Sequence, residues 1–338
     1  MTHEIRLLFQ TLNSWQKAGK KAIFVSVVAL DGQSYRRPGV RMIISDNGEY
    51  VGAVSGGCIE QEIERQAQSV FRSGIPRVIT YDGRLRVGCE GILFLLIEPV
   101  YLSAELLNDF ESVLNLRTKF RLDTYYYHSV NEFVNTGTFI ALGNNTYSLN
   151  PSLQGFQVSD QLCFSQTFDP LFRMYIIGAE HDAVQLCQSA TLLGWEVTIV
   201  ASAEESKSCE YFPGASALIT PSFENIDTSV FDSQTAVVLM SHSFNRDVQY
   251  LMALRDCRPA YLGMVGSVKR RERVLSMLLE YCPDISIDFL EQIHGPAGLS
   301  IGAENASEIA VSILAEILTV TRNQKPVSLR SKTGSIHG

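Results

Sequence analysis

Two cysteines of this chain stand beside glycines, a setting in which a thiol can meet a ligand at close range. Cys58 lies in Ser55-Gly56-Gly57-Cys58-Ile59-Glu60, where a predicted strand passes into a predicted helix. Glycines permit a sharp turn and close backbone approach to a ligand. The free N–H groups at a helix start favour an anion and lower the pKa of a thiol. The pattern predicts a sulfur carrier or soft ligand, and a small residue packed behind a tight turn explains it equally well.

The second cysteine lies in Gly88-Cys89-Glu90-Gly91, beside another predicted strand. Its alternative interpretation is a strand bulge with an inert thiol. The carboxylate of Glu90 disfavours a thiolate at Cys89, unless the two side chains point to opposite faces of the strand. Arg36 and Arg37, in the turn before Pro38-Gly39, supply positive charge for an anionic ligand. An arginine pair in a turn is, however, more often simply solvated.

The elements that position these residues are mostly strands. Alternating or β-branched apolar runs predict strands at 22–30, 40–44, 50–54, 77–81 and 92–98, with a helix at 59–71. Residues 101–170 contain a helical stretch at 102–116 and an aromatic-rich stretch at 125–149. They either complete the first domain or connect it to the second.

From residue 171 onward, predicted strands alternate with helices. The strands fall at 174–177, 196–201, 236–240 and 260–265, and Gly194 ends the helix predicted at 180–193. A closing helix follows Asn305, whose spacing to Glu308 is that of a capping box. The fold class predicted is α/β: an N-terminal mixed α/β domain (1–100), an extension of uncertain assignment (101–170), a C-terminal Rossmann-like doubly wound parallel sheet (171–322) and a tail (323–338).

Polar residues also follow the strand ends of the second half. They are His181, Asp182 and His242, and together with Gly178 they form a candidate polar site because open α/β sheets hold ligands at the carboxyl ends of their strands. No third close ligand accompanies the histidines, so we predict no metal there. A hydrogen-bonded loop histidine is the simpler identity of each.

The same strand ends argue against NAD(P). In Gly178-Ala179-Glu180, the glutamate puts bulk and negative charge where a dinucleotide fold needs a glycine beside the pyrophosphate. Ala201-Ser202 provides no carboxylate for the ribose hydroxyls. A dehydrogenase that uses NAD in the ordinary way is therefore disfavoured.

Composition excludes other classes. The chain has 338 residues, a net charge of −8 and 46% hydrophobic residues, which suits two globular domains and argues against nucleic-acid binding. Residues 1–20 are amphipathic rather than a signal peptide, and no apolar run is long enough to span a membrane. The seven cysteines form no CxxC pair, which is typical of reduced thiols in a cytoplasmic protein.

Taken in order, these motifs resemble those of the xanthine dehydrogenase accessory protein (XdhC/CoxI) family. The resemblance rests on an ordered series at 32–39, 55–60, 88–91, 98–99, 178–181, 241–247, 261–267, 293–303 and 307–316. Members usually carry Gly-Cys-Gly-Gly where this chain has Gly88-Cys89-Glu90-Gly91. This difference weakens the assignment of the family's functional role to Cys89. Residues 100–170 carry no recognisable motif.

The resemblance implies an accessory protein rather than an enzyme. It would bind the molybdenum cofactor (molybdopterin) as cargo, protect it while a cysteine desulfurase supplies its sulfido ligand, and pass it to a molybdenum hydroxylase apoenzyme, as a homodimer. The implied cofactor-binding residues are Arg36, Arg37, Ser55, Gly56, Gly57, Cys58, Glu60, Gly88, Cys89 and Gly91, with Cys58 and Cys89 contacting sulfur or molybdenum. Two alternatives stay open: a nucleotide-dependent oxidoreductase, and a diverged scaffold without ligand binding, which Glu90 and Glu180 favour.

Overall fold

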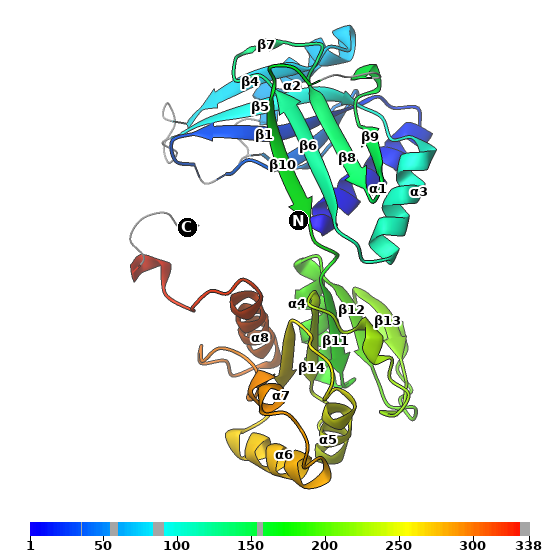
Figure 1. Cartoon of the computed structure of the whole chain (residues 1–338), viewed down its shortest axis with the longest axis vertical. Coiled ribbons are helices and arrows are strands. Elements are labelled where there is room, and N and C mark those ends of the chain that lie inside the picture. Colours follow the sequence, from blue (N-terminus) through cyan, green and yellow to red (C-terminus); the bar gives the residue numbers. More distant parts are fainter. Residues whose placement is uncertain (35, 55–59, 84–90, 154–157, 332–338) are drawn as a thin grey trace. The chain divides into compact units, whose positions relative to one another are not determined.

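The computed structural model describes residues 1–34, 36–54, 60–83, 91–153 and 158–331 (Figure 1). The chain divides into two units, Met1–Pro170 and Leu171–Gly338. Ser55, Gly56, Gly57, Cys58, Gly88 and Cys89 lie outside the described residues. Residues 101–170, whose assignment the sequence left open, belong to the first unit.

The first unit contains two antiparallel sheets. The larger has the order β3-β2-β1-β5-β4-β7, with β1 Ala22–Asp31, β2 Arg41–Ser45, β3 Tyr50–Gly52, β4 Arg77–Asp82, β5 Ile92–Val100 and β7 Asn131–Glu132. The smaller has the order β10-β6-β8-β9, with β6 Phe120–Tyr126, β8 Gly137–Leu142, β9 Asn145–Ser148 and β10 Leu162–Phe168. The aromatic-rich stretch thus supplies strands, and Gly143, with a φ of 59°, lies in the turn between β8 and β9.

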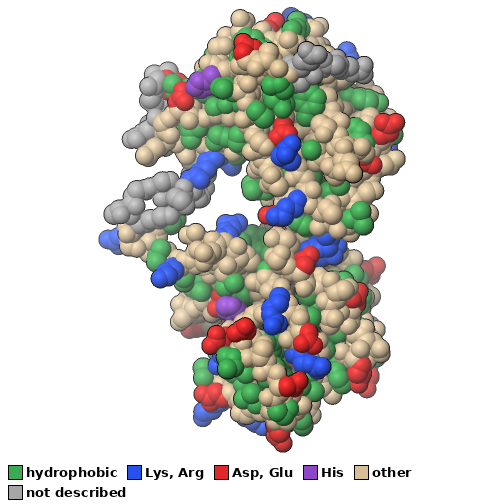
Figure 2. Space-filling model, in the orientation of Figure 1, with side chains coloured by type: hydrophobic (Ala, Val, Ile, Leu, Met, Phe, Trp, Pro, Cys, Tyr) green, Lys and Arg blue, Asp and Glu red, His purple; other side chains and the backbone are tan. Residues whose placement is uncertain are grey.

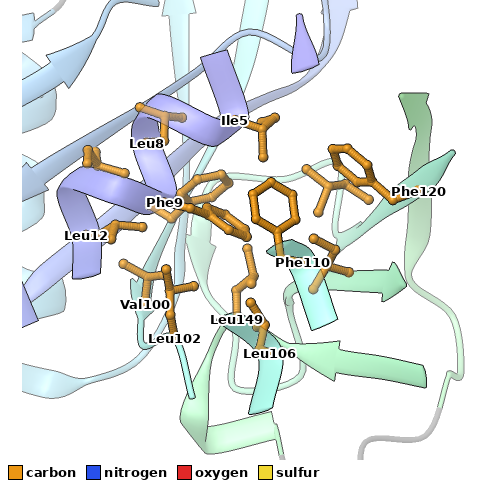
Figure 3. Packing of buried hydrophobic residues seen from close by; sticks show 14 of the residues in the cluster. Ile5, Leu8, Phe9, Leu12, Val100, Leu102, Leu106, Phe110, Phe120 and Leu149 are labelled. Carbon is orange, nitrogen blue, oxygen red and sulfur yellow. The ribbon is translucent and has the colours of Figure 1, made fainter. Parts of the chain in front are cut away.

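Three helices cover the larger sheet. Helix α2 (Glu60–Ser73) buries Ile63, Ala67 and Val70 on one face of the sheet. Helices α1 (Thr2–Lys17) and α3 (Ala104–Asn115) share a core with the other face and with the smaller sheet. In that core the ring of Phe9 from α1 meets the ring of Phe110 from α3 at 4.8 Å between centroids (Figure 3).

The second unit is built on one parallel sheet with the order β13-β12-β11-β14-β15-β16. Its strands are β11 Arg173–Ile177, β12 Glu196–Val200, β13 Ala215–Ile219, β14 Thr235–Leu239, β15 Tyr261–Met264 and β16 Ile293–His294. The four strands predicted from the sequence are parallel neighbours in this sheet, as expected. The sequence missed β13 and β16.

Helices lie on both faces of this sheet. Helices α4 (His181–Leu192) and α8 (Ala306–Thr321) contribute to one core, and α5 (Phe244–Ala253), α6 (Val268–Tyr281) and α7 (Ile287–Gln292) contribute to the other. The predicted fold class, a mixed α/β domain followed by a Rossmann-like doubly wound sheet, is confirmed. β11 and β14 lie side by side at the centre, and the chain leaves them in opposite directions across the sheet. This is the topological switch point at which such sheets hold ligands.

Local signals for the helix ends are also confirmed. Gly194 follows α4 with a φ of 76°, and the side chain of Asn305 accepts a hydrogen bond from the N–H of Glu308 at 3.0 Å. None of the helices in the described ranges combines the length and apolar character that a bilayer crossing requires. On the face of the second unit shown in Figure 2, acidic and basic side chains are interspersed rather than gathered by sign.

Candidate functional site

Three of the four motif-bearing segments of the first unit join the same end of the larger sheet. Asp31, the last residue of β1, pairs with Ile92, the first residue of β5, and Asp82 at the end of β4 pairs with Ile92 from the other side. The last residue of β3, Gly52, pairs with Met42 near the start of β2. The segments 32–40, 53–59 and 83–91 therefore all connect to this one end, which we call the motif end of the sheet.

Helix α2 also presents its N-terminus at the motif end. The chain leaves β3 at this end and enters β4 at Arg77, which pairs with Ile97 toward the opposite end. Helix α2 connects the two and packs along the sheet. Glu60 is its first residue, so the positive end of the helix dipole lies two residues after Cys58 in sequence.

Gly91 brings two of the segments into direct contact. A Cβ atom at this position would lie 2.8 Å from the carbonyl oxygen of Gln33 and from Leu30 Cδ1, and 2.9 Å from the carbonyl oxygen of Asp31. Real Cβ atoms do not approach so closely, so this position requires glycine. The end of the second cysteine motif is thereby packed against the start of the segment that carries Arg36 and Arg37.

Arg36 and Arg37 lie in the connection from β1 to β2, Arg36 half-buried and Arg37 exposed. The base of this connection is closed by the N–H of Gly39, which donates to the carbonyl of Val27 at 2.8 Å. Both guanidinium groups therefore lie on the segment whose ends are fixed at the motif end. Their positive charge suits an anionic ligand.

Arg41, which the sequence did not single out, supports this connection from within the unit. Its Nη1 donates to the carbonyl of Gly39 at 2.8 Å and to Oε1 of Gln166 at 2.5 Å. Burial lowers the pKa of Arg41 to about 10. Its Nε and Nη2 have no hydrogen-bond partner among the described residues. A buried cation therefore fixes the Pro38-Gly39 turn.

A histidine and a carboxylate also meet at the motif end. His128 Nε2 lies 3.6 Å from Oδ2 of Asp31, and its ring lies over that of Phe94 with centroids 3.9 Å apart. Sequence reasoning missed this pair because it joins the end of β1 to a residue beyond β6. The only local signal is that His128 directly follows a run of tyrosines.

In the second unit the structure brings together part of the predicted polar site. His242 follows β14 and Asp182 lies in α4, which follows β11, and His242 Nε2 lies 3.7 Å from Oδ2 of Asp182 across the switch point. His242 has a φ of 54°, a conformation that few residues other than glycine adopt. His181 is exposed in the first turn of α4. Within the described part of the chain, no group of three or more His, Cys, Asp or Glu residues is arranged to hold a metal.

Gly178 and Glu180 lie in the turn from β11 into α4. A Cβ at Gly178 would lie 2.4 Å from the carbonyl oxygen of Met240, so this glycine permits close packing of two strand ends. Glu180 is the N-cap residue of α4, and its Oε2 lies 3.8 Å from Lys207 Nζ. With Asp182 in the first turn, two acidic residues lie at the start of α4, the end of a helix that favours anions.

Two family models match this chain. A family model described as the XdhC and CoxI family matches residues 15–82, and a model described as the XdhC Rossmann domain matches residues 174–317. The chain therefore belongs to the XdhC and CoxI family.

Two relatives span most of the chain. One, from Bacillus subtilis (strain 168), is named as a probable subunit of xanthine dehydrogenase and is 26% identical over 317 residues, covering 88% of this chain and 93% of the relative. The other, from Escherichia coli (strain K12), is named molybdenum cofactor insertion chaperone PaoD and is 28% identical over 314 residues, covering 91% of this chain and 86% of the relative.

A solved structure shares the fold. It is described as a xanthine dehydrogenase from Bacillus halodurans, with a TM-score of 0.74 and 23% identity, and the match covers 96% of this chain and 97% of that one.

Proposed function

We propose that this protein binds the molybdenum cofactor as cargo and supports its insertion into a xanthine dehydrogenase-type molybdenum hydroxylase. The observation that carries the proposal is the joining of three motif-bearing segments, two of them with a cysteine, to one end of the larger sheet. The proposal is supported by similarity over most of the chain to a relative named as a molybdenum cofactor insertion chaperone.

The roles proposed for the residues follow from their chemistry. Cys58 and Cys89 would contact molybdenum or sulfur, because thiolates are soft ligands. Arg36 and Arg37 would neutralise the anionic phosphate of the pterin. Backbone N–H groups of Ser55, Gly56 and Gly57, before the first turn of α2, would add donors for the same anion, with Glu60 beside them. Gly88 and Gly91 would let the backbone approach the ligand closely.

The finer parts of the proposal concern partners. The terminal sulfido ligand would be installed on the bound cofactor with sulfur supplied by a cysteine desulfurase, and the loaded protein would then bind the hydroxylase apoenzyme. We propose that the protein works as a homodimer in the cytoplasm. A buried cation behind the arginine turn, and the close contact at Gly91, would keep the motif end in one geometry before the cofactor arrives.

The test is to purify the full chain after co-expression with the enzymes of cofactor biosynthesis and to measure bound molybdenum and pterin. We expect both to co-purify in a constant ratio to protein, and Cys58→Ala to reduce the amount at least several-fold. Cys163→Ala is the matched control, because Cys163 is an exposed thiol on β10 of the same unit. Folded protein that carries neither molybdenum nor pterin would instead support the diverged scaffold.

A further inference from the structure

The second unit contains a pocket that the proposed function does not use. Its volume is about 220 Å³, and it lies beyond the carboxyl ends of β11, β12, β13 and β14. Its lining includes Ser202, Phe223, Arg246, Gln249 and Tyr250. We infer that this pocket binds a nucleoside monophosphate, with the phosphate at Arg246 and Ser202.

The phosphate position follows from the pairing of two donors. Arg246 Nη2 donates to Ser202 Oγ at 3.0 Å, which joins α5 to the segment that follows β12. The end of this strand is where a dinucleotide fold places a carboxylate for ribose hydroxyls, or an arginine for a ribose phosphate. Here a hydroxyl and a guanidinium take that place. Guanidinium groups bind phosphate oxygens through two parallel N–H donors, so the pair suits a phosphomonoester.

The walls of the pocket suit a flat heteroaromatic base. The hydroxyl of Tyr250 donates to the carbonyl of Pro221 at 3.0 Å, which fixes the tyrosine against the segment after β13. Phe223 also lines the pocket and is partly buried against the same core. The side-chain amide of Gln249 has both a donor and an acceptor for the edge of a base. Apolar walls with a few polar groups are typical of small-molecule sites.

The size and the charge of the pocket limit the ligand to one phosphate. This volume lies below the range of about 300–1,000 Å³ typical of drug-sized ligands, so the pocket takes no ligand larger than a nucleoside monophosphate. On the side of α4, Gly178, Ala179 and Glu180 line it, and the carboxylate of Glu180 repels a second phosphate at the helix start. A dinucleotide is therefore both too large and wrongly charged.

Glu205 and Glu224 also line the pocket, and Glu204, outside the lining, lies near Arg246. Glu205 lies 3.1 Å from Lys207 Nζ, which also lies 3.8 Å from Glu180. Glu204 lies 3.8 Å from Arg246 Nη2, but its side chain is 90% exposed, so water screens the pair. Glu224 is exposed as well. The side chain of Arg246 is 45% exposed, which leaves its guanidinium accessible to a ligand.

The experiment is calorimetry on the full chain with four probes: 5′-AMP, 5′-GMP, 5′-CMP and 2′-AMP, each compared with its nucleoside. We expect at least one monophosphate to bind at least tenfold more tightly than its nucleoside. Arg246→Ala should remove that difference, weakening the monophosphate at least tenfold while the nucleoside changes by less than twofold. Arg255→Ala is the control, because Arg255 is an exposed arginine outside the pocket lining, just after α5, and it should change neither affinity.

Three outcomes would overturn the inference. They are the absence of saturable binding by any monophosphate up to about 1 mM, equal affinities for monophosphate and nucleoside, and unchanged monophosphate affinity in Arg246→Ala. The comparison of 2′-AMP with 5′-AMP distinguishes recognition of a 2′-phosphate from recognition of a 5′-phosphate. Because no probe contains molybdenum or a pterin, the result is independent of the proposed function.

Discussion

The buried carboxyl group of Glu98 on β5 bonds twice to Thr138 on β8 and so joins the two sheets of the first unit. Its Oε2 accepts the backbone N–H of Thr138 at 2.9 Å, and its Oε1 accepts the threonine hydroxyl at 2.5 Å. Gly137 leaves room for the carboxyl group, because a Cβ there would lie 2.7 Å from Oε2. Burial raises the pKa of Glu98 to about 7. The Glu98-Pro99 motif therefore has a structural role.

This pKa predicts that the stability of the first unit depends on pH. The folded pKa of Glu98, about 7, lies above the ordinary value of 4.5, so the folded protein holds this proton more tightly than the unfolded chain. The resulting stabilisation is complete below about pH 4.5 and is lost as the pH rises through 7. Between pH 5.5 and pH 8 we expect the free energy of unfolding to fall by about 2 kcal/mol from this group.

The measurement uses urea unfolding with Trp15 as the reporter, in a Trp195→Phe background, since the chain has two tryptophans and Trp15 is buried in the first unit. Glu98→Gln keeps the shape of the side chain and should flatten the pH dependence. Glu111→Gln, an exposed carboxylate on α3, should leave it unchanged. An unaltered pH slope in Glu98→Gln would contradict the assignment.

Removal of the Asp247 carboxylate should greatly reduce the stability of the second unit, because this carboxylate forms a buried ion pair. The side chain of Asp247 is 1% exposed, and its carboxylate accepts hydrogen bonds from Arg270 Nη2 and Ser241 Oγ, each at 2.6 Å. Asp247→Ala leaves Arg270 without this partner and should cost about 3 kcal/mol. Unfolding followed by the fluorescence of Trp195 measures this cost.

The control for this prediction is Asp256→Ala. Asp256 is 89% exposed and lies 3.5 Å from Arg255, so its removal should change stability by about 0.5 kcal/mol or less. Similar losses in the two variants would show that burial of the Asp247 pair does not matter.

We expect that a larger side chain at Gly91 disturbs the packing of the motif end and thereby reduces the retention of the cofactor. Gly91→Ala places a Cβ 2.8 Å from the carbonyl oxygen of Gln33, and we expect a cost of about 2 kcal/mol together with reduced retention of the cofactor. Gly19→Ala is a reference for backbone strain without a clash, because Gly19 has a φ of 74° and open space around it, whereas Gly91 has a clash and no positive φ. It should cost about 1 kcal/mol and leave retention unchanged. A smaller loss for Gly91→Ala than for Gly19→Ala would refute the contact.

Local patterns in the sequence predicted the four central strands of the parallel sheet, because each is rich in apolar residues, and β11, β14 and β15 are each followed by an α-helix. They missed β13, whose residues are half-buried or exposed, and β16, which has two residues. Neither has a clear period to detect.

The contacts that define the sites are harder to predict, since they depend on how elements pair in space. The register of β1 with β5 brings Gly91 to Gln33, and the order of the parallel sheet brings Arg246 to Ser202. The sequence named the segments involved in the first case but not their contact. Ser202 was noted only for lacking a carboxylate, whereas its bond to Arg246 suggests a different ligand.

We predict that the second unit binds NAD and NADP only weakly. Glu180 at the N-cap of α4 and Asp182 in its first turn oppose a pyrophosphate. We expect dissociation constants above about 10 μM, which corresponds to a binding free energy weaker than roughly −7 kcal/mol. Calorimetry at low salt is the test, and tighter binding by either dinucleotide would restore the oxidoreductase as a candidate function.

The two motif cysteines, Cys58 and Cys89, lie outside the described residues. The segments that carry them enter the sheet at one end, and α2 begins two residues after Cys58. If both line one cofactor pocket, Cys58 and Cys89 converge although thirty-one positions separate them in sequence. If the two thiols are instead packed separately, with no shared ligand, no particular proximity of their sulfur atoms is expected. We expect mild oxidation of the cofactor-free protein to link Cys58 to Cys89, and peptide mass spectrometry to show no link from either to the exposed Cys163.

If the two cysteines line one pocket, a single substitution should affect ligand retention without affecting folding. Cys58→Ala should reduce the retention of molybdenum and pterin while leaving the thermal midpoint nearly unchanged, because a thiol at the rim of a pocket contributes little packing. Cys163→Ala should change neither property. Loss of folding in Cys58→Ala, with unaltered binding per folded molecule, would make Cys58 a core residue. An experimental structure with the two sulfur atoms on opposite faces of the unit would exclude a shared pocket, whatever the retention measurements gave.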